Sequence, residues 1–258
     1  MTYLITGHKG FIGTNLTYYL QSKIEEVIGI DYYDGDLCKG IPSSIKNLSI
    51  HTIVHLAAET NVRDSIANPS KCFLRNCQST TNILEFASAK KAKLIFISSC
   101  GACRPSSPYT ASKIAGEAIC RAYKSSYDSD IVILRLPNIY GPYSDHKTSV
   151  IPAFIKSKLL GREVTIYGDG NQKRDFVYVK DICRAIYTAD RDKQLTSGRL
   201  TSINEIANLI GCKATHSKPI QGEIDCIGSF TNISPEHSLE HNLKETIEWF
   251  KNFYRIDN

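Results

Sequence analysis

Tyr109 and Lys113 are spaced so that their side chains can act on the same proton. A separation of four residues places both on one face of a helix, one turn apart. A lysine cation beside a phenol favours the phenolate, so we expect Lys113 to lower the pKa of Tyr109 towards the range of a general acid and base. An isolated pair of this kind is more often an exposed tyrosine beside a solvated lysine. The catalytic interpretation of the pair therefore needs support from other residues of the chain.

A second chemical signal is the glycine-rich segment TGHKGFIG at residues Thr6–Gly13. Gly7 allows a sharp turn, Gly10 lets a pyrophosphate approach the main chain, and Gly13 allows a helix to pack closely on a strand. Free N–H groups at the start of that helix would bind the anion. An incidental turn is the alternative, because a glycine pattern alone is weak evidence.

Asp31 ends an apolar run 18 residues after Gly13 and bears on the choice of cofactor. A carboxylate at this position can accept a hydrogen bond from a ribose 2′-hydroxyl and would repel a 2′-phosphate. A solvated turn residue is the alternative. The turn and the acid together predict NAD rather than NADP.

These residues must be positioned by an alternating series of strands and helices. Strands are predicted at 3–5, 27–30, 52–56, 94–97 and 131–134, and helices at 11–20, 73–89 and 110–125. Continuous apolar strands separated by helices indicate a doubly wound parallel sheet of the Rossmann type, covered on both faces. We expect residues 1–138 to form an NAD-binding domain, with a segment near 175–190 returning to it. Residues 139–258 are expected to form mostly a smaller substrate-binding lobe.

Composition limits the class of protein. The chain has 258 residues, of which 42% are hydrophobic and 22% charged, as in ordinary globular proteins. No apolar stretch approaches the roughly 20 residues of a membrane span, and no basic-then-apolar leader is seen. The net charge of +5 is spread thinly, which argues against a nucleic-acid partner. Nine irregularly spaced cysteines predict reduced thiols in a cytoplasmic protein, and no cluster suggests a metal.

Further motifs follow in a fixed order along the chain. They are Thr6–Gly13, Asp31, His55-Leu-Ala-Ala58, Asn76, Ser98-Ser99, residues 107–117 (SPYTASKIAGE), residues 135–142 (RLPNIYGP) and residues 167–181 (YGDGNQKRDFVYVKD). In this order the chain resembles the extended short-chain dehydrogenase/reductase family of NAD-dependent nucleotide-sugar epimerases and dehydratases. The resemblance covers residues 3 to about 190 and is weaker beyond.

The resemblance implies roles for individual residues. Tyr109 would be the acid and base, and Lys113 would bind the nicotinamide ribose. The residues implied at the cofactor are Gly7, Gly10, Phe11, Ile12, Gly13, Asp31, Asp36, Leu37, Leu56, Ala57, Ala58, Asn76, Ser98, Tyr109 and Lys113. Those implied at the nucleotide sugar are Thr60, Asn138, Val150 and Arg174, with Arg174 at the diphosphate unless it pairs with Asp175. The resemblance also implies a homodimer formed through the helices at about 73–89 and 110–125.

The chain departs from the family pattern after the fourth apolar strand. The Ser or Thr that contacts the reacting sugar oxygen falls on Cys100, with Ser99 beside it. A thiol is a weak donor, so either Ser99 takes this role or Cys100 fills it poorly. Dehydratases continue with an Asp-Glu pair and decarboxylases with a Glu, where this chain has Gly101-Ala102. The pattern Cys100-x-x-Cys103 also permits a redox dithiol or half of a zinc site.

The chain is also short between its motifs. Ile53 follows Asp31 by only 22 positions, too few for a full strand-helix-strand passage, and Gly35-Asp36-Leu37 resembles a remnant of the family's adenine-binding segment. No clear counterpart of a second diphosphate-binding arginine is found around residues 219–224.

Three functions remain open from the sequence. The favoured one is epimerisation of a nucleotide sugar at C4 through a 4-keto intermediate, on UDP-glucose and UDP-galactose or their N-acetylated forms. The second is a 4,6-dehydratase or keto-sugar reductase of the same family. The third is a binding protein that kept the dinucleotide fold without turnover.

Overall fold

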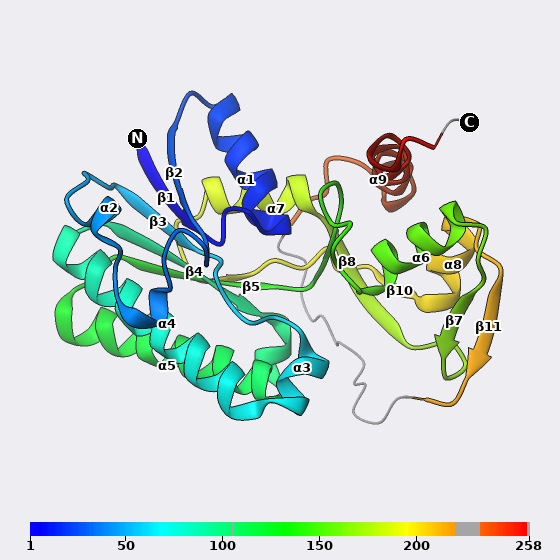
Figure 1. Ribbon diagram of the computed structural model, residues 1–258, viewed down its shortest axis with the longest axis horizontal. Coiled ribbons are helices and arrows are strands. Elements are labelled where there is room, and N and C mark those ends of the chain that lie inside the picture. The colour runs from blue at the N-terminus through cyan, green and yellow to red at the C-terminus, as the bar shows by residue number, and fades with distance from the viewer. Residues whose placement is uncertain (105, 220–232, 257–258) are drawn as a thin grey trace. The chain divides into compact units, whose positions relative to one another are not determined.

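The computed structural model describes residues 1–104, 106–219 and 233–256. The chain divides into two compact units, Met1–Leu136 with Cys183–Gln194, and Pro137–Ile182 with Leu195–Asn258. Each unit has its own sheet and helices, labelled in Figure 1.

The first unit is built on a six-stranded sheet with the strand order β2-β1-β3-β4-β5-β9. All neighbouring strands pair in parallel. The strands are β1 (Thr2–Thr6), β2 (Glu26–Ile30), β3 (Thr52–His55), β4 (Lys93–Ser99), β5 (Ile131–Leu136) and β9 (Lys193–Gln194). This parallel, helix-covered sheet confirms the predicted α/β class.

Helices cover both faces of this sheet. Helices α4 and α5 lie together on one face and α1 lies on the other (Figure 1). The helical segments are α1 (Phe11–Ser22), the short turn η1 (Leu37–Lys39), α2 (Ser43–Lys46), α3 (Val62–Ala67), α4 (Pro69–Lys90), the turn η2 (Cys100–Cys103) and α5 (Pro108–Tyr127). Only η1 and α2 connect β2 to β3, in accord with the short spacing in the sequence.

Local sequence explains where α5, the helix that carries Tyr109 and Lys113, begins. Ser107 caps α5 by accepting a hydrogen bond from the Thr110 amide at 3.2 Å, and Thr110 reciprocates in a capping box. Pro108 occupies the first turn, where its missing N–H costs no intrahelical bond. Tyr109 is thereby fixed in the first turn of the helix.

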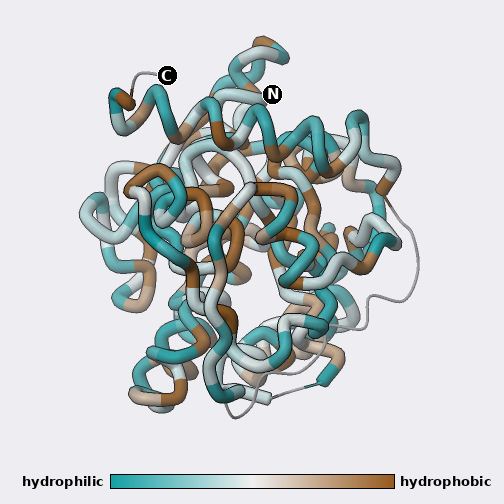
Figure 2. Tube along the Cα trace, turned by 90° about the vertical axis from the view of Figure 1, so that its right-hand side faces the viewer, coloured by the Kyte–Doolittle hydropathy of each residue, from teal (hydrophilic) through white to brown (hydrophobic). Residues whose placement is uncertain are grey.

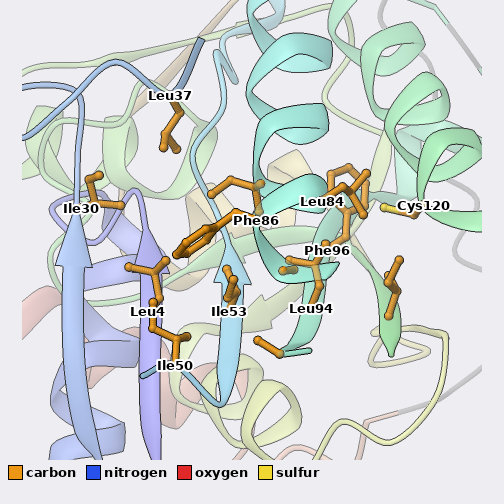
Figure 3. Close-up of a cluster of buried hydrophobic side chains, with 14 of the residues drawn as sticks. Leu4, Ile30, Leu37, Ile50, Ile53, Leu84, Phe86, Leu94, Phe96 and Cys120 are labelled. Carbon is orange, nitrogen blue, oxygen red and sulfur yellow. The ribbon is translucent and has the colours of Figure 1, made fainter. Parts of the chain in front are cut away.

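The core of this unit lies between the sheet and helices α4 and α5. Strand residues such as Leu4, Ile53 and Phe96 meet Leu84 and Phe86 of α4 (Figure 3). Leu4, Ile53 and Leu84 are at most 1% exposed. Burying each such side chain contributes about 1.5–3 kcal/mol, so this packing holds the strand ends in place.

The second unit contains two small sheets. Strand β8 (Lys173–Tyr178) runs parallel to β6 (Asn138–Tyr140) and antiparallel to β10 (Leu200–Ser202). Strand β7 (Val164–Tyr167) pairs in parallel with β11 (Ala214–Ser217). The helices are α6 (Val150–Leu159), α8 (Ile203–Ile210), α9 (Leu239–Tyr254) and the start of α7 (Val179–Tyr187).

Helix α9 is amphipathic. Leu243 and Phe250 are buried, whereas Phe253 is exposed. Hydrophobic and hydrophilic segments accordingly alternate along the helix that leads to the C-terminal label in Figure 2. Trp249 is half-buried and its ring lies 5.0 Å from those of Tyr143 and Phe253. Phe250 is therefore part of the core of the second unit.

The expected return of the chain to the large sheet occurs later than predicted. The segment near 175–178 belongs to β8, which pairs with β6 and β10 rather than with the large sheet. The part that rejoins the first unit is Cys183–Gln194, the end of α7 and β9. There Tyr187 packs its ring 6.5 Å from Tyr3. Within the described residues, no helix has the length and apolar character needed to span a membrane.

Candidate active site

The glycine turn joins β1 to α1 and is packed too closely for side chains. A Cβ on Gly7, which has φ +75°, would lie 2.9 Å from the Ala57 nitrogen, and a Cβ on Gly13 would lie 2.2 Å from the Gly7 oxygen. Gly10 caps α1 without a side-chain hydrogen bond. The first amides of α1 therefore have no side-chain acceptor at the cap, as a bound pyrophosphate requires. Phe11 is buried and Ile12 half-buried at the start of this helix.

Asp31 is fixed against this turn. Its carboxylate accepts hydrogen bonds from the Lys9 amide at 3.1 Å and the Tyr32 amide at 2.8 Å. Lys9 also pairs with Asp34 at 3.0 Å. Asp31 is half-buried and places a negative charge beside the glycine turn, so it is more than a solvated turn residue. The turn and this carboxylate together fit a dinucleotide with an unphosphorylated ribose.

Asp36 and Leu37 have side chains that are engaged in the fold. Asp36 caps η1 by accepting from the Cys38 amide at 3.0 Å and pairs with Arg75 at 3.2 Å. Leu37 is 7% exposed and belongs to the hydrophobic core. The contact of both residues with the cofactor stays a prediction.

The loop after β3 lies beside the glycine turn. Thr6 holds it by accepting from the Ala57 amide through its hydroxyl at 3.2 Å and from the Leu56 amide through its carbonyl at 3.1 Å. Leu56, Ala57 and Ala58 are half-buried, and Thr60 is exposed further along. Three half-buried, mostly small residues at a strand end leave access for a flat ligand.

Asn76 of α4 fastens the far end of this loop. Its Oδ1 accepts from the Glu59 amide at 2.8 Å, and its Nδ2 donates to the Glu59 carbonyl at 3.1 Å and to Ser112 Oγ at 2.9 Å. Asn76 is 4% exposed and Ser112 2% exposed. The side chain thus positions the loop through buried hydrogen bonds. The Ser112 contact had no signal in the sequence.

The Ser98 side chain is engaged in the fold, and its contact with the cofactor stays a prediction. Its hydroxyl donates to Glu117 Oε1 at 2.7 Å, and Glu117 also binds Arg135 through Oε1–Nε at 2.7 Å and Oε2–Nη2 at 2.6 Å. Burial would raise the pKa of Glu117, but hydrogen bonds from Arg135 and Ser98 outweigh it and hold that pKa below its usual value. Ser98 therefore supports a buried ion pair through its side chain.

Tyr109 and Lys113 lie one turn apart on α5, as predicted, but their electrostatics differ from the expectation. Burial raises the pKa of Tyr109 to about 12, although a hydrogen bond with Ser99 opposes this shift. Burial lowers the pKa of Lys113 to about 8. The Lys113 ammonium is 5% exposed and donates to the Ile97 carbonyl at 2.8 Å. The predicted lowering of the Tyr109 pKa by Lys113 is wrong, because desolvation dominates.

Ser99 and Cys100 have different surroundings. Ser99 Oγ accepts from the Gly101 amide at 3.1 Å and bonds to Tyr109. Cys100 is 6% exposed, and its thiol donates to the Arg135 carbonyl at 3.7 Å. Of the two candidates, Ser99 is the one beside the tyrosine.

The remaining predicted substrate residues lie in the second unit. Asn138 donates to the Asp175 carbonyl at 3.3 Å, and half-buried Arg174 donates to the Lys173 carbonyl at 2.9 Å. The Asp175 carboxylate accepts from Ser197 Oγ at 2.7 Å and from the Ser197 and Gly198 amides. Val150 begins α6. Of residues 219–224, only Pro219 is among the described residues.

Lys147 is a residue that sequence reasoning missed. It is half-buried three positions before Val150, and burial lowers its pKa. Its carbonyl, with that of Asp145, accepts from the Lys156 ammonium. Among the described residues no acidic side chain pairs with the Lys147 ammonium. A half-buried cation of this kind suits an anionic ligand.

The histidines and cysteines of the described chain form no metal site. No group of three or more His, Cys, Asp or Glu side chains there is placed to hold an ion. His55 is 1% exposed and bonds Thr6 Oγ1 at 2.8 Å and Thr80 Oγ1 at 3.3 Å. Burial lowers its pKa to about 3, so it is a neutral, hydrogen-bonded core residue.

Comparison with known proteins defines the family. Residues 3–203 match the model of the NAD dependent epimerase/dehydratase family, so the chain belongs to that family, and NAD is its cofactor. The putative UDP-glucose 4-epimerase of Methanocaldococcus jannaschii is 31% identical, with 96% of this chain and 98% of that protein aligned. That alignment spans 299 positions, more than the 258 residues here, so this chain has internal deletions relative to that protein.

Two further proteins show how broad the likeness is. The structure of a UDP-glucose 4-epimerase from Thermotoga maritima with UDP-glucose superimposes with a TM-score of 0.89 at 25% identity, covering 98% of this chain and 100% of that one. The dTDP-glucose 4,6-dehydratase 1 of Escherichia coli is 25% identical over 100% of this chain and 95% of that protein. The chain is therefore of the nucleotide-sugar-modifying class, which includes both epimerases and dehydratases.

Proposed function

We propose that this protein epimerises a nucleotide sugar at C4 through a 4-keto intermediate. The observation that carries the proposal is the pairing of Tyr109 with Ser99, followed by a turn whose next positions are Gly101 and Ala102. Epimerisation needs oxidation and reduction at one carbon only. It requires one acid-base group and no further carboxylate for a proton at a neighbouring carbon. Likeness to two UDP-glucose 4-epimerases supports the same reaction.

The residues of the first unit have separate roles in this reaction. The glycine turn and Asp31 would hold NAD, which would supply a hydride acceptor and donor for C4. Tyr109 takes the proton of the 4-hydroxyl and gives it back, and Ser99 orients that oxygen by a hydrogen bond. At neutral pH the Tyr109 phenol keeps its proton in the cofactor-free protein, since burial raises its pKa to about 12. Positive charge from a bound nicotinamide, added to that of Lys113, would favour the Tyr109 phenolate and so make it a base.

The substrate is proposed to be a UDP-sugar such as UDP-glucose or its N-acetylated form. Arg174 would contact the diphosphate with its guanidinium. Lys147 would add a positive charge for an anionic group of the same substrate, because it has no acidic partner among the described residues. Asn138, Val150 and Thr60 would line the sugar nucleotide.

A 4,6-dehydratase is the competing function, supported by the relative from Escherichia coli. That reaction removes water across two sugar carbons and needs additional proton transfer. Gly101 and Ala102 carry no ionisable side chain at the positions that would supply it. This is why we place the dehydratase second.

The test is a product assay on the purified protein. UDP-glucose, UDP-galactose and their N-acetylated forms are incubated separately and the products are resolved by proton NMR. We expect a C4 epimer without net formation of NADH. A 6-deoxy-4-keto sugar would show a dehydratase instead. Bound NAD with no product from any of the four sugars would favour the non-catalytic function.

We also propose a cytoplasmic homodimer. The eight described cysteines form no disulfide, which suits a reducing compartment. Helices α4 and α5 lie side by side on one face of the large sheet, and Phe73 and Leu74 of α4 are exposed apolar residues there. Light scattering after size exclusion should give twice the chain mass. A monomer at micromolar concentration would contradict the dimer.

A further inference from the structure

Two cysteines stand at the ends of the single turn that follows β4. Cys100 and Cys103 are the first and last residues of η2, a 3-10 turn, and neither is part of a disulfide. Residues three apart in such a turn lie one above the other, about 6 Å apart along the axis. That spacing lies in the range of Cα separations found in disulfides.

Both sulfur atoms meet the same residue. Arg135 donates from Nη1 to Cys103 Sγ at 3.4 Å, and Cys100 Sγ donates to the Arg135 carbonyl at 3.7 Å. Cys103 is exposed, whereas Cys100 is 6% exposed. Cys103 Sγ also donates to Gln194 Oε1 at 3.8 Å, and the Arg135 guanidinium pairs with Glu117. An exposed thiol beside a guanidinium, with a second thiol at the other end of the same turn, can be oxidised in two steps.

We propose that Cys100 and Cys103 are a peroxide-oxidised dithiol whose disulfide slows the neighbouring active site. The Cys103 sulfur attacks hydrogen peroxide, the O–O bond breaks, and the products are a sulfenic acid and water. The Cys100 sulfur then attacks the sulfenic sulfur, the S–O bond breaks, and a second water leaves. Two electrons and two protons pass from the thiols to the peroxide in total. A dithiol reductant reverses the change by thiol–disulfide exchange.

The turn between the two sulfur atoms touches the proposed catalytic groups. Gly101 lies inside it, and its amide donates to Ser99 Oγ at 3.1 Å. A Cβ on Gly101 would lie 2.8 Å from Thr110 Cγ2, so the turn packs tightly on the residue after Tyr109. An S–S bond draws both sulfur atoms away from Arg135, and we expect the Gly101 amide between them to shift and to change the orientation of Ser99. We expect turnover to fall by about tenfold, equivalent to roughly 1.4 kcal/mol of barrier.

The disulfide itself is tested by mass, independently of any activity. The NAD-loaded protein is treated with hydrogen peroxide, alkylated with iodoacetamide, digested and analysed. The expected peptide holds Cys100 and Cys103 unalkylated and is two hydrogens lighter than the reduced form. Alkylation of both thiols after peroxide, or conversion of Cys103 to a sulfinic acid without a bond to Cys100, would overturn the proposal.

The effect on turnover rests on the proposed function and is measured separately. Wild-type activity should fall with peroxide and return with dithiothreitol. The Cys103→Ser variant should keep its basal activity and show no reversible loss. Cys212→Ser, which alters a half-buried thiol of the second unit, is the matched control and should remain as sensitive as wild type. Equal losses in wild type and Cys103→Ser would contradict the link to this turn, even where the disulfide forms.

Discussion

Asn76 of α4 donates a hydrogen bond to Ser112 of α5 across 2.9 Å. Ser112 immediately precedes Lys113, and two further hydrogen bonds of the Asn76 amide hold the main chain of Glu59. One buried side chain thus connects the loop after β3, which lies beside the glycine turn, to α5, the helix that carries the proposed catalytic pair.

Replacing Asn76 with Ala should destabilise the first unit. The change leaves the Glu59 amide without its acceptor, and an unsatisfied buried group costs about 1–3 kcal/mol. The Glu59 carbonyl keeps the Cys72 thiol and the Ser112 hydroxyl keeps the Tyr109 carbonyl. We expect the midpoint of urea unfolding to fall clearly. Gln78→Ala, at an exposed position of the same helix, should change it little. Similar midpoints for Asn76→Ala and wild type would show that the loop does not depend on this amide.

Ser99 and Cys100 should respond differently to removal of their polar atoms. Ser99→Ala is expected to lower kcat about 100-fold or more, since it removes the hydrogen bond to the reacting oxygen. Cys100→Ala should affect kcat much less, because its thiol faces the Arg135 carbonyl. Steady-state kinetics with the active UDP-sugar decide the matter. A larger loss of kcat in Cys100→Ala than in Ser99→Ala would show that Cys100, and not Ser99, contacts the reacting oxygen.

Lys113→Met should stabilise the cofactor-free protein while abolishing turnover. Burial lowers the pKa of Lys113 from 10.5 to about 8, so between these values the unfolded chain binds more protons than the folded one. Wild-type stability therefore rises as pH rises from 8 to 10.5. The loss of stability caused by burying the charged Lys113 ammonium is fully present at pH 7 and is on the order of 3 kcal/mol.

The measurement is the Tm of both cofactor-free proteins across this pH range. Lys113→Met should have the higher Tm at pH 7, and its advantage should shrink towards pH 10.5. The loss of the bond to the Ile97 carbonyl reduces the gain without changing its pH dependence. A lower Tm for Lys113→Met at pH 7, or an advantage that is independent of pH, would contradict the buried charge.

Asp31 should decide between the two dinucleotides. Asp31→Ser removes the acceptor for the ribose hydroxyls and the charge that repels a 2′-phosphate. We expect NAD to bind about 10-fold or more weakly and NADP to bind better, as measured by calorimetry. Asp34→Ser alters an exposed carboxylate of the same turn and should leave the preference for NAD intact. An unchanged ratio of the two affinities in Asp31→Ser would contradict the role.

The fold of the first unit was predictable because its signals are local. Apolar runs such as 94–97 and 131–134 fall inside the observed strands β4 and β5, and the glycine turn stands where Thr6–Gly13 placed it. The segment near 175–178 was expected to return to the large sheet but forms β8. Its partners, β6 and β10, are distant in sequence, so no local signal indicated this pairing. A run of apolar residues indicates a strand but not the sheet to which that strand belongs.

The electrostatics of the site were harder to predict. The spacing of Tyr109 and Lys113 fixes their common face but not the depth at which the helix buries them. Desolvation therefore reversed the expected direction of the Tyr109 pKa. The direction of Ser98 towards Glu117, and the half-buried cation of Lys147, likewise depend on packing that no motif records.

The most direct test of the central claim follows a labelled hydrogen at the reacting carbon. UDP-glucose carrying deuterium at C4 is incubated with the NAD-loaded protein, and the product is examined by proton and deuterium NMR. We predict UDP-galactose with the deuterium retained at C4, and no such product from Tyr109→Phe. Deuterium found at another sugar carbon or in the solvent, or unchanged product formation by Tyr109→Phe, would contradict epimerisation by this tyrosine.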